Sequence, residues 1–318
     1  MDLIKDLKLS RTVYSLCFPE TEITLKNFLS ENDFSDLYTE TWTKKQDHYH
    51  IEYADAFKNW SKNAIKFNLN YFYPSNGASE AIREQIAYIA NSKNIFVFEG
   101  EYEGYESIVN GLGKKVTKIK RSEYNKKENV DLYNESTAFF ISQPSSIDGN
   151  YWKEFYDFIK IMESKNSSVF VDVVYIGCTK ENIQLDLTSD SIKGLFFSLS
   201  KSFGVYYHRI GGCYLKDENP LLYGNIWFKN VLSMKFGVKL MNEFKLGYFP
   251  EKYSLAKEKV ILNIEKDLNL KVIDSSSLLL VNFYKKGLFF EKDLIRDSES
   301  KLLRVCITPR LEKLIREK

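Results

Sequence analysis

Cysteine and histidine are scarce in this chain, and their scarcity limits the chemistry that it can perform. The 318 residues include four cysteines, none of them in a Cys-x-x-Cys pair, and three histidines. Structural zinc sites draw four ligands from closely spaced cysteines and histidines, so this sequence carries no zinc pattern and we expect no metal site. Scattered cysteines also favour free thiols and a reducing compartment over a disulfide framework.

Long apolar runs and an excess of one charge are lacking as well. No apolar run approaches the roughly 20 residues of a membrane-spanning helix. The N-terminal residues Met1–Asp6 carry too many charges for a signal peptide. The 45 basic residues nearly balance the 43 acidic ones, for a net charge of +2, and this balance does not indicate a nucleic-acid or membrane partner. We therefore expect a cytoplasmic protein that binds neither.

The chain does have enough apolar material for a sizeable core, because 44% of its residues are hydrophobic and 15% are aromatic. Short apolar runs alternate with amphipathic stretches such as 151–165, which predicts a three-layer α/β/α fold around a mainly parallel sheet. Residues 218–248 predict a long helical stretch that breaks near Gly237. We expect three parts: an N-terminal segment at 1–60 in the small domain or a dimer interface, a large domain at 61–248, and a small α+β C-terminal domain at 249–318.

The stretch from 194 to 213 holds the most unusual pattern. An apolar strand at 194–197 runs into Ser198-Leu-Ser-Lys201, and Gly204 and Arg209-Ile-Gly211 follow. A lysine at this place can be an ordinary solvent-facing loop residue. If it is buried near other cations, however, its pKa falls and its amine becomes a usable nucleophile.

Other polar residues also follow apolar stretches. The turn at Asn76-Gly77 leads into a helix near Ser79, and a helix N-terminus suits a phosphate group, although an ordinary capped helix begins in the same way. Asp172 ends an apolar run, where a carboxylate is costly unless it is paired or caps a helix. Because the carboxyl ends of parallel strands meet at one edge of a sheet, we expect a ligand site there. The residues that this topology gathers are Ser79, Tyr102, Gln143, Asp172 and Lys201.

Taken together, these motifs resemble those of the fold-type I pyridoxal-phosphate enzymes, the aminotransferase class I/II-like superfamily. The resemblance covers Ser-x-x-Lys with its glycine and Arg-x-Gly, the Asn-Gly-Ala-Ser turn, and the Asp-x-x-Tyr that begins at Asp172. It implies that Lys201 carries pyridoxal 5′-phosphate as a Schiff base and acts as the catalytic acid and base. It implies further cofactor contacts from Gly77, Ala78, Ser79, Tyr102, Gln143, Asp172, Tyr175, Ser198 and Arg209.

The resemblance also implies a role for each contact. The phosphate would lie against the 77–79 turn, Ser198 and Arg209, and Tyr102 would stack on the pyridine ring. Asp172 would pair with the ring nitrogen, so that the ring acts as an electron sink, and Tyr175 would bind the phenolic oxygen. Gln143 stands where the family has the asparagine that donates to the phenolic oxygen, and its amide on a longer stem could keep that role. Glu101 stands where the family often has proline.

Arg304 lies inside the apolar run 302–308, and the resemblance implies that it binds the substrate α-carboxylate through a bidentate contact. An edge-strand arginine in solvent is the alternative. Glu101, Glu103 and His208 could add a substrate contact, but we expect each of them on the solvated surface.

The resemblance implies a homodimeric aminotransferase of amino-acid biosynthesis that acts on amino-acid and keto-acid substrates. A decarboxylase or lyase on the same scaffold is an alternative, because the sequence does not reveal which bond at the substrate Cα is broken. A non-catalytic cofactor-binding or partner-binding relative is another, because the turn at Gln143-Pro144 departs from the family pattern.

Overall fold

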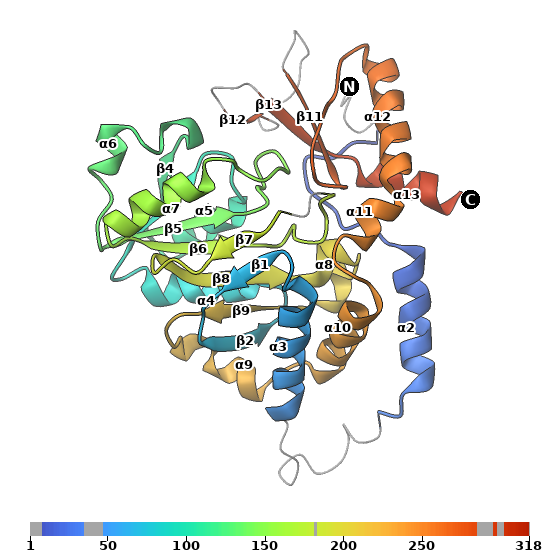
Figure 1. Ribbon diagram of the computed structural model, residues 1–318, viewed down its shortest axis with the longest axis horizontal. Coiled ribbons are helices and arrows are strands. Elements are labelled where there is room, and N and C mark those ends of the chain that lie inside the picture. Colours follow the sequence, from blue (N-terminus) through green and yellow to red (C-terminus); the bar gives the residue numbers. More distant parts are fainter. Residues whose placement is uncertain (1–7, 35–46, 181–182, 285–294, 298–301, 318) are drawn as a thin grey trace.

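A large sheet with helices on both faces forms the body of the protein, and a small antiparallel sheet lies beside it (Figure 1). This arrangement comes from a computed structural model, which describes residues 8–34, 47–180, 183–284, 295–297 and 302–317. The large sheet has seven described strands, most of them parallel. The three-layer α/β/α fold with a mainly parallel sheet, predicted from the sequence, is therefore confirmed.

The seven strands follow an order that differs from their order in the sequence. Neighbouring strands of β8, β6, β5, β3 and β4 pair in parallel, whereas β9 is antiparallel to both β8 and β2. Polar residues that follow the parallel strands therefore share one edge of the sheet. Across the sheet the order is β2 (Tyr71–Ser75), β9 (Gly211–Leu215), β8 (Ile192–Ser198), β6 (Ser168–Asp172), β5 (Thr137–Ser142), β3 (Asn94–Phe98) and β4 (Thr117–Ile119).

Alternation along each strand builds two separate apolar layers. In β5, Ala138 and Phe140 join the cluster under α4 (Ala78–Ile89) and α5 (Glu103–Gly111). Phe139 and Ile141 join the larger cluster, which includes residues of α3 (Asp47–Ser61) and α7 (Phe155–Ser164). Strands covered on both faces are apolar at nearly every position, which explains the short continuous apolar runs in the sequence.

The predicted helix break near Gly237 was wrong. Gly237 lies inside α10 (Val231–Glu243), and a Cβ there would come within 2.9 Å of the Ile210 Cγ2 and 3.0 Å of the Tyr53 Cε2. This glycine therefore allows close packing rather than a break. The helical stretch is interrupted before Asn230, between α9 (Tyr223–Trp227) and α10, and the Asn230 side chain caps α10 by accepting the Ser233 N–H at 3.0 Å.

The C-terminal part of the chain forms the small antiparallel sheet together with an N-terminal residue. Its strands lie in the order β10 (Ile273–Asp274), β11 (Leu280–Tyr284), β13 (Leu302–Cys306) and β12 (Ile295–Asp297). Ser10 bridges to Cys306, so the N-terminal segment lies against β13. The division into three parts remains a prediction. The C-terminal helices are α11 (Tyr248–Lys252), α12 (Ser254–Leu268) and α13 (Thr308–Arg316), whereas α2 (Pro19–Glu31) lies against α10.

Two further observations concern membrane-spanning helices and metal sites. Within the described ranges, no helix combines the length and the apolar character needed to cross a membrane. The same ranges contain no group of three or more histidine, cysteine, aspartate or glutamate side chains placed to hold a metal ion.

Candidate functional site

The predicted site residues converge at the carboxyl edge of the large sheet. A cavity of about 140 Å³ opens there, beside the ends of β3, β5, β6 and β8. Four of the predicted residues line it: Tyr102, Tyr175, Lys201 and Arg304. Six others line it as well, and of these only Glu103 had been considered from the sequence: Arg11, Thr12, Val13, Glu103, Ser146 and Arg296.

Lys201 lies just past the end of β8, in the short helix α8 (Leu199–Ser202). The Ser198 hydroxyl caps this helix by accepting the Ser200 N–H at 3.2 Å. The Lys201 Nζ lies 4.7 Å from the centre of the Tyr175 ring. The cap and the ring therefore fix where the amine enters the cavity.

The expected fall in the pKa of Lys201 was wrong for the protein without cofactor. Burial lowers the pKa, but the neighbouring acidic groups of Tyr175 and Asp172 raise it by more, so the pKa lies above its ordinary value. The sequence argument assumed cationic neighbours, whereas the groups closest to the amine are acidic. The acidic neighbours therefore favour the charged form of the Lys201 amine in this state.

Asp172 lies at the end of β6 and is buried. Its Oδ1 accepts the Val174 N–H at 2.9 Å, and its Oδ2 accepts the Tyr105 hydroxyl at 3.3 Å. Burial raises the pKa of Asp172 to about 6, against the lowering effect of the Lys201 charge. A carboxylate in this setting gains from a cationic ring N–H partner.

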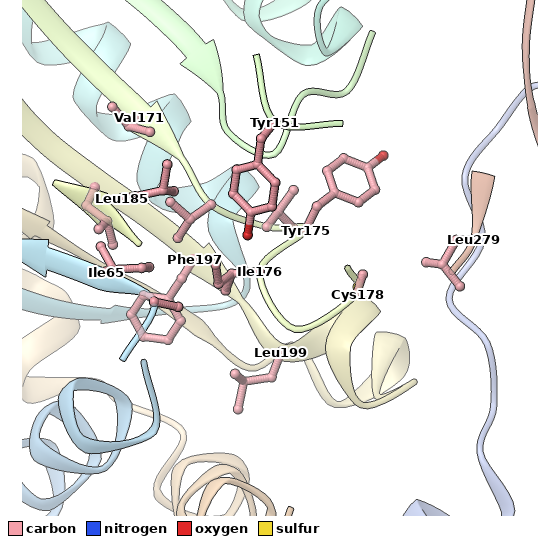
Figure 2. Packing of buried hydrophobic residues seen from close by; sticks show 14 of the residues in the cluster. Ile65, Tyr151, Val171, Tyr175, Ile176, Cys178, Leu185, Phe197, Leu199 and Leu279 are labelled. Atoms are coloured by element: carbon pink, nitrogen blue, oxygen red, sulfur yellow. The ribbon is translucent and has the colours of Figure 1, made fainter. Parts of the chain in front are cut away.

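The apolar side of this region supports the loop that follows β6. Figure 2 shows Tyr175, Ile176 and Cys178 on this loop, with Phe197 and Leu199 of the adjoining segment nearby. The Tyr175 hydroxyl points away from Phe197 and Leu199. Packing therefore holds the ring of Tyr175 and leaves its hydroxyl outside the apolar cluster.

Glu101 is buried, so the expectation that it could be a solvated surface residue was wrong. Its carboxylate accepts the Ser142 hydroxyl at 2.5 Å, the Ser146 hydroxyl at 2.7 Å and the Ser142 N–H at 3.2 Å. Burial raises the pKa of Glu101 despite these bonds. The available signal was the glutamate in place of proline, facing a serine-rich turn after β5.

The predicted phosphate residues also come together. Gly77 adopts a φ of +84°, and a Cβ there would lie 2.5 Å from the Arg209 Nη2 and 3.6 Å from the Ser198 Oγ. Arg209 Nη2 donates to the Asn76 carbonyl at 2.8 Å. Ser79, in the first turn of α4, shares a 3.2 Å hydrogen bond with the Tyr102 hydroxyl.

This cradle fits a phosphate group. Gly211 approaches Gly77 so closely that a Cβ would lie 2.6 Å from the Gly77 Cα, so both positions need glycine. The open backbone, the serine hydroxyls and the Arg209 guanidinium are all donors, and they gather at the N-terminus of α4. The donor set therefore suits the phosphate of pyridoxal phosphate, with Lys201 and Asp172 on the neighbouring strands.

Gln143 is a predicted cofactor contact whose side chain binds another part of the protein. Its Oε1 accepts the Trp152 N–H at 3.1 Å and its Nε2 donates to the Trp152 carbonyl at 3.3 Å. Gln143 does not line the Lys201 cavity, whereas Ser146 of the same turn does. The expected contact between Gln143 and the phenolic oxygen remains a prediction, and the Ser146 hydroxyl, which lines the cavity, already donates its proton to Glu101.

Arg304 is buried on β13 rather than exposed at a sheet edge. Its Nη1 donates to the Ser146 carbonyl and its Nη2 to the Arg11 carbonyl at 3.2 Å. Its Nε is buried without a hydrogen-bond partner. A buried guanidinium whose partners among the described residues are carbonyl groups is suited to receive a carboxylate.

The fold and the site define the class: a three-layer α/β protein with a lysine, a buried aspartate and a phosphate cradle at the carboxyl edge of its sheet. The sequence model described as aminotransferase class I and II matches residues 25–236. The chain therefore belongs to the aminotransferase class I and II family. The resemblance to fold-type I pyridoxal-phosphate enzymes is thus confirmed.

Solved structures with this fold span several activities. A pyridoxal-phosphate-bound C–S lyase from Staphylococcus hominis is 14% identical, with 96% of this chain and 86% of that chain covered and a TM-score of 0.72. An aminotransferase from Staphylococcus aureus is 11% identical, with 96% and 91% covered and a TM-score of 0.70.

The histidinol-phosphate aminotransferase from Clostridium acetobutylicum is 14% identical, with 96% and 97% covered and a TM-score of 0.66. No curated protein matches the chain in sequence. At these identities the likeness shows the fold alone, so the reaction must be argued from the residues of this site.

Proposed function

We propose that this protein is a pyridoxal-phosphate-dependent aminotransferase that acts on an amino acid, with Lys201 as the covalent attachment point of the cofactor. One observation supports this most strongly. Lys201 enters the same cavity as the buried Arg304, and it interacts electrostatically with the buried Asp172. The arrangement thus combines the amine of Lys201, a partner for the ring nitrogen in Asp172 and a binding group for the substrate carboxylate in Arg304.

Each side chain has one proposed task. Asp172 holds a proton on the pyridine nitrogen, and the bound ring then supplies an electron sink for a bond broken at the substrate Cα. The Tyr175 hydroxyl donates to the phenolic oxygen, and Tyr102 covers one ring face. Once its amine is free, Lys201 takes up and returns the proton at the substrate Cα.

The remaining tasks are binding and placement. Gly77, Ala78 and Ser79 offer backbone and hydroxyl donors to the phosphate, and Ser198 and Arg209 complete the cradle. Arg304 binds the substrate α-carboxylate and thereby orients the amine toward Lys201. Glu101 accepts the Ser146 hydroxyl and thereby orients this side chain in the wall of the cavity.

We also propose a cytoplasmic homodimer. All four cysteines are free thiols, which suits a reducing compartment. Large aromatic side chains are exposed near Arg209, including Tyr206, Tyr207 and Phe228. A second copy that covered these rings would also shield the phosphate cradle.

A donor screen tests the reaction. Cofactor-loaded protein is incubated with a panel of amino acids, and the products are identified by mass detection, with Lys201→Ala as the inactive control and Lys160→Ala as an exposed-lysine control. We expect a keto acid from at least one donor. Carbon dioxide would instead indicate decarboxylation, ammonia would indicate elimination, and no product from any donor would indicate a non-catalytic relative.

A further inference from the structure

The Lys201 cavity is lined by more cationic groups than one α-carboxylate requires. Arg11, Arg296, Arg304 and Lys201 line it, and Glu103 is the one acidic side chain among the described lining residues. One guanidinium suffices for a substrate carboxylate. The surplus points to a second anionic group on the ligand.

Arg296 is held firmly although it lies on a strand of only three residues. Gly100, with a φ of +83°, lies so close to that strand that a Cβ would come 1.9 Å from the Arg296 carbonyl oxygen. The Arg296 side chain is 9% exposed, and its Nη1 donates to the Glu103 Oε1 at 2.9 Å. The Gly100 turn and Glu103 therefore fix Arg296 from its backbone to its guanidinium.

Arg296 and Arg304 are both incompletely paired. The Nε of each is buried without a hydrogen-bond partner. Burial and the charge of Arg304 lower the pKa of Arg296 to about 10, so each guanidinium makes the other less favourable. Two buried cations in one small cavity gain from two anions more than from one.

Glu103 partly fills the place of such an anion. Its Oε1 accepts both the Arg296 Nη1 at 2.9 Å and the Arg11 Nη2 at 2.8 Å. The side chain of Glu103 is 58% exposed, so it can withdraw into solvent when a stronger ligand binds. A carboxylate of the incoming ligand would then replace the exposed Glu103 as the partner of Arg296.

We infer that the substrate is an acidic amino acid, whose side-chain carboxylate binds Arg296 while its α-carboxylate binds Arg304. This inference rests on the proposed function and names its substrate class. Arg296 and Arg304 line the same cavity as Lys201, which is the arrangement that a dicarboxylic ligand requires.

The test compares unreactive ligands of equal chain length by isothermal titration calorimetry. Glutarate carries two carboxylates and valerate carries one, and neither has an amine to react. We expect cofactor-loaded wild type to bind glutarate about 10- to 100-fold more tightly than valerate, the range of one added charge-assisted pair. Equal affinities, or no binding of glutarate, would overturn the inference.

Single substitutions test whether Arg296 is the residue that causes the preference for glutarate. Arg296→Met should remove the preference for glutarate and leave valerate binding unchanged, whereas Arg316→Met, an exposed surface control, should change neither. Glu103→Gln should strengthen glutarate binding, because it removes the competing internal carboxylate. If Arg296→Met weakened both ligands equally, or Glu103→Gln weakened glutarate, the assignment would be wrong.

Two readouts separate this inference from the proposed function. The absorption band of the bound cofactor is recorded on each sample before titration, and thermal unfolding confirms that each variant is folded. A normal band with equal affinities refutes only the acidic substrate. Absence of the band in the wild type refutes the proposed function and this inference with it.

Discussion

Replacing Asp172 with asparagine should change how the stability of the cofactor-free protein depends on pH. Burial raises the pKa of Asp172 from 3.8 to about 6. A raised folded-state pKa means that the contribution of Asp172 is fully present below pH 3.8 and is lost as the pH rises through 6. Asparagine does not titrate, so the variant lacks this loss.

The magnitude follows from the same two pKa values. A difference of about 2 in pKa, at roughly 1.4 kcal/mol per unit, corresponds to about 3 kcal/mol. Between pH 4 and pH 7 the free energy of unfolding of Asp172→Asn should therefore rise by about 2 kcal/mol relative to wild type, because part of the change has already occurred at pH 4. Loss of the bond from the Tyr105 hydroxyl adds a constant offset of about 1 kcal/mol at every pH.

Urea unfolding of cofactor-free protein at several pH values measures this difference. Asp157→Asn is the matched control, because that side chain is 66% exposed and should leave the pH profile unchanged. If the difference between Asp172→Asn and wild type stayed constant from pH 4 to pH 7, Asp172 would not be a strained buried carboxyl group. The reasoning that assigns it a cationic ring partner would then lose its physical basis.

Substitutions at three further positions probe other parts of the site. Glu101→Leu should destabilise the protein by about 3–5 kcal/mol in urea unfolding, because two hydroxyls and one N–H lose their buried acceptor. Glu101→Gln should cost about 1 kcal/mol. Equal destabilisation by the two substitutions would refute the role of Glu101 as a buried acceptor. Gly77→Ala should weaken cofactor binding at least about 10-fold in equilibrium dialysis, because the new Cβ would collide with Arg209 and because alanine disfavours the positive φ of this position. An unchanged affinity would show that the phosphate binds elsewhere. Arg304→Lys should raise KM for the amino donor about 100-fold and leave the absorption band of the cofactor intact, since lysine lacks the planar guanidinium that binds a carboxylate through two hydrogen bonds. An unchanged KM would show that Arg304 does not bind the substrate.

The fold was predictable because the central strands of the large sheet are covered on both faces. Full coverage makes the strands apolar at almost every position, and the sequence shows this directly in runs such as 94–98 and 138–142. Gly237 misled the prediction, because a glycine that breaks a helix and a glycine that lets two elements pack closely look the same in a sequence. Only the contacts with Ile210 and Tyr53 distinguish them.

The phosphate cradle and the edge of the sheet were predictable because their residues are close in sequence or follow strands. The second arginine was not, because Arg296 comes to the cavity through the close approach of β12 to the Gly100 turn. Such a contact joins segments almost 200 residues apart and leaves no local pattern. The burial of Glu101 was also hard to predict, since the serines that stabilise this glutamate follow a different strand.

Gln143 illustrates the limit of reading one residue by its position in a motif. An amide on a longer stem can reach other partners, and here it binds both polar groups of the Trp152 backbone. The cavity then receives Ser146 from the same turn. The identity of the donor to the phenolic oxygen thus depends on how the turn folds.

The central claim, that Lys201 carries the cofactor covalently, is tested most directly by absorption spectroscopy with borohydride reduction. Wild type and Lys201→Ala are each incubated with pyridoxal phosphate, reduced, and digested for peptide mapping. We predict a visible cofactor band in the wild type, fixed by reduction on the peptide that contains Lys201, and no such adduct in the variant. A wild type without the band, or with the adduct on another lysine, would contradict the account.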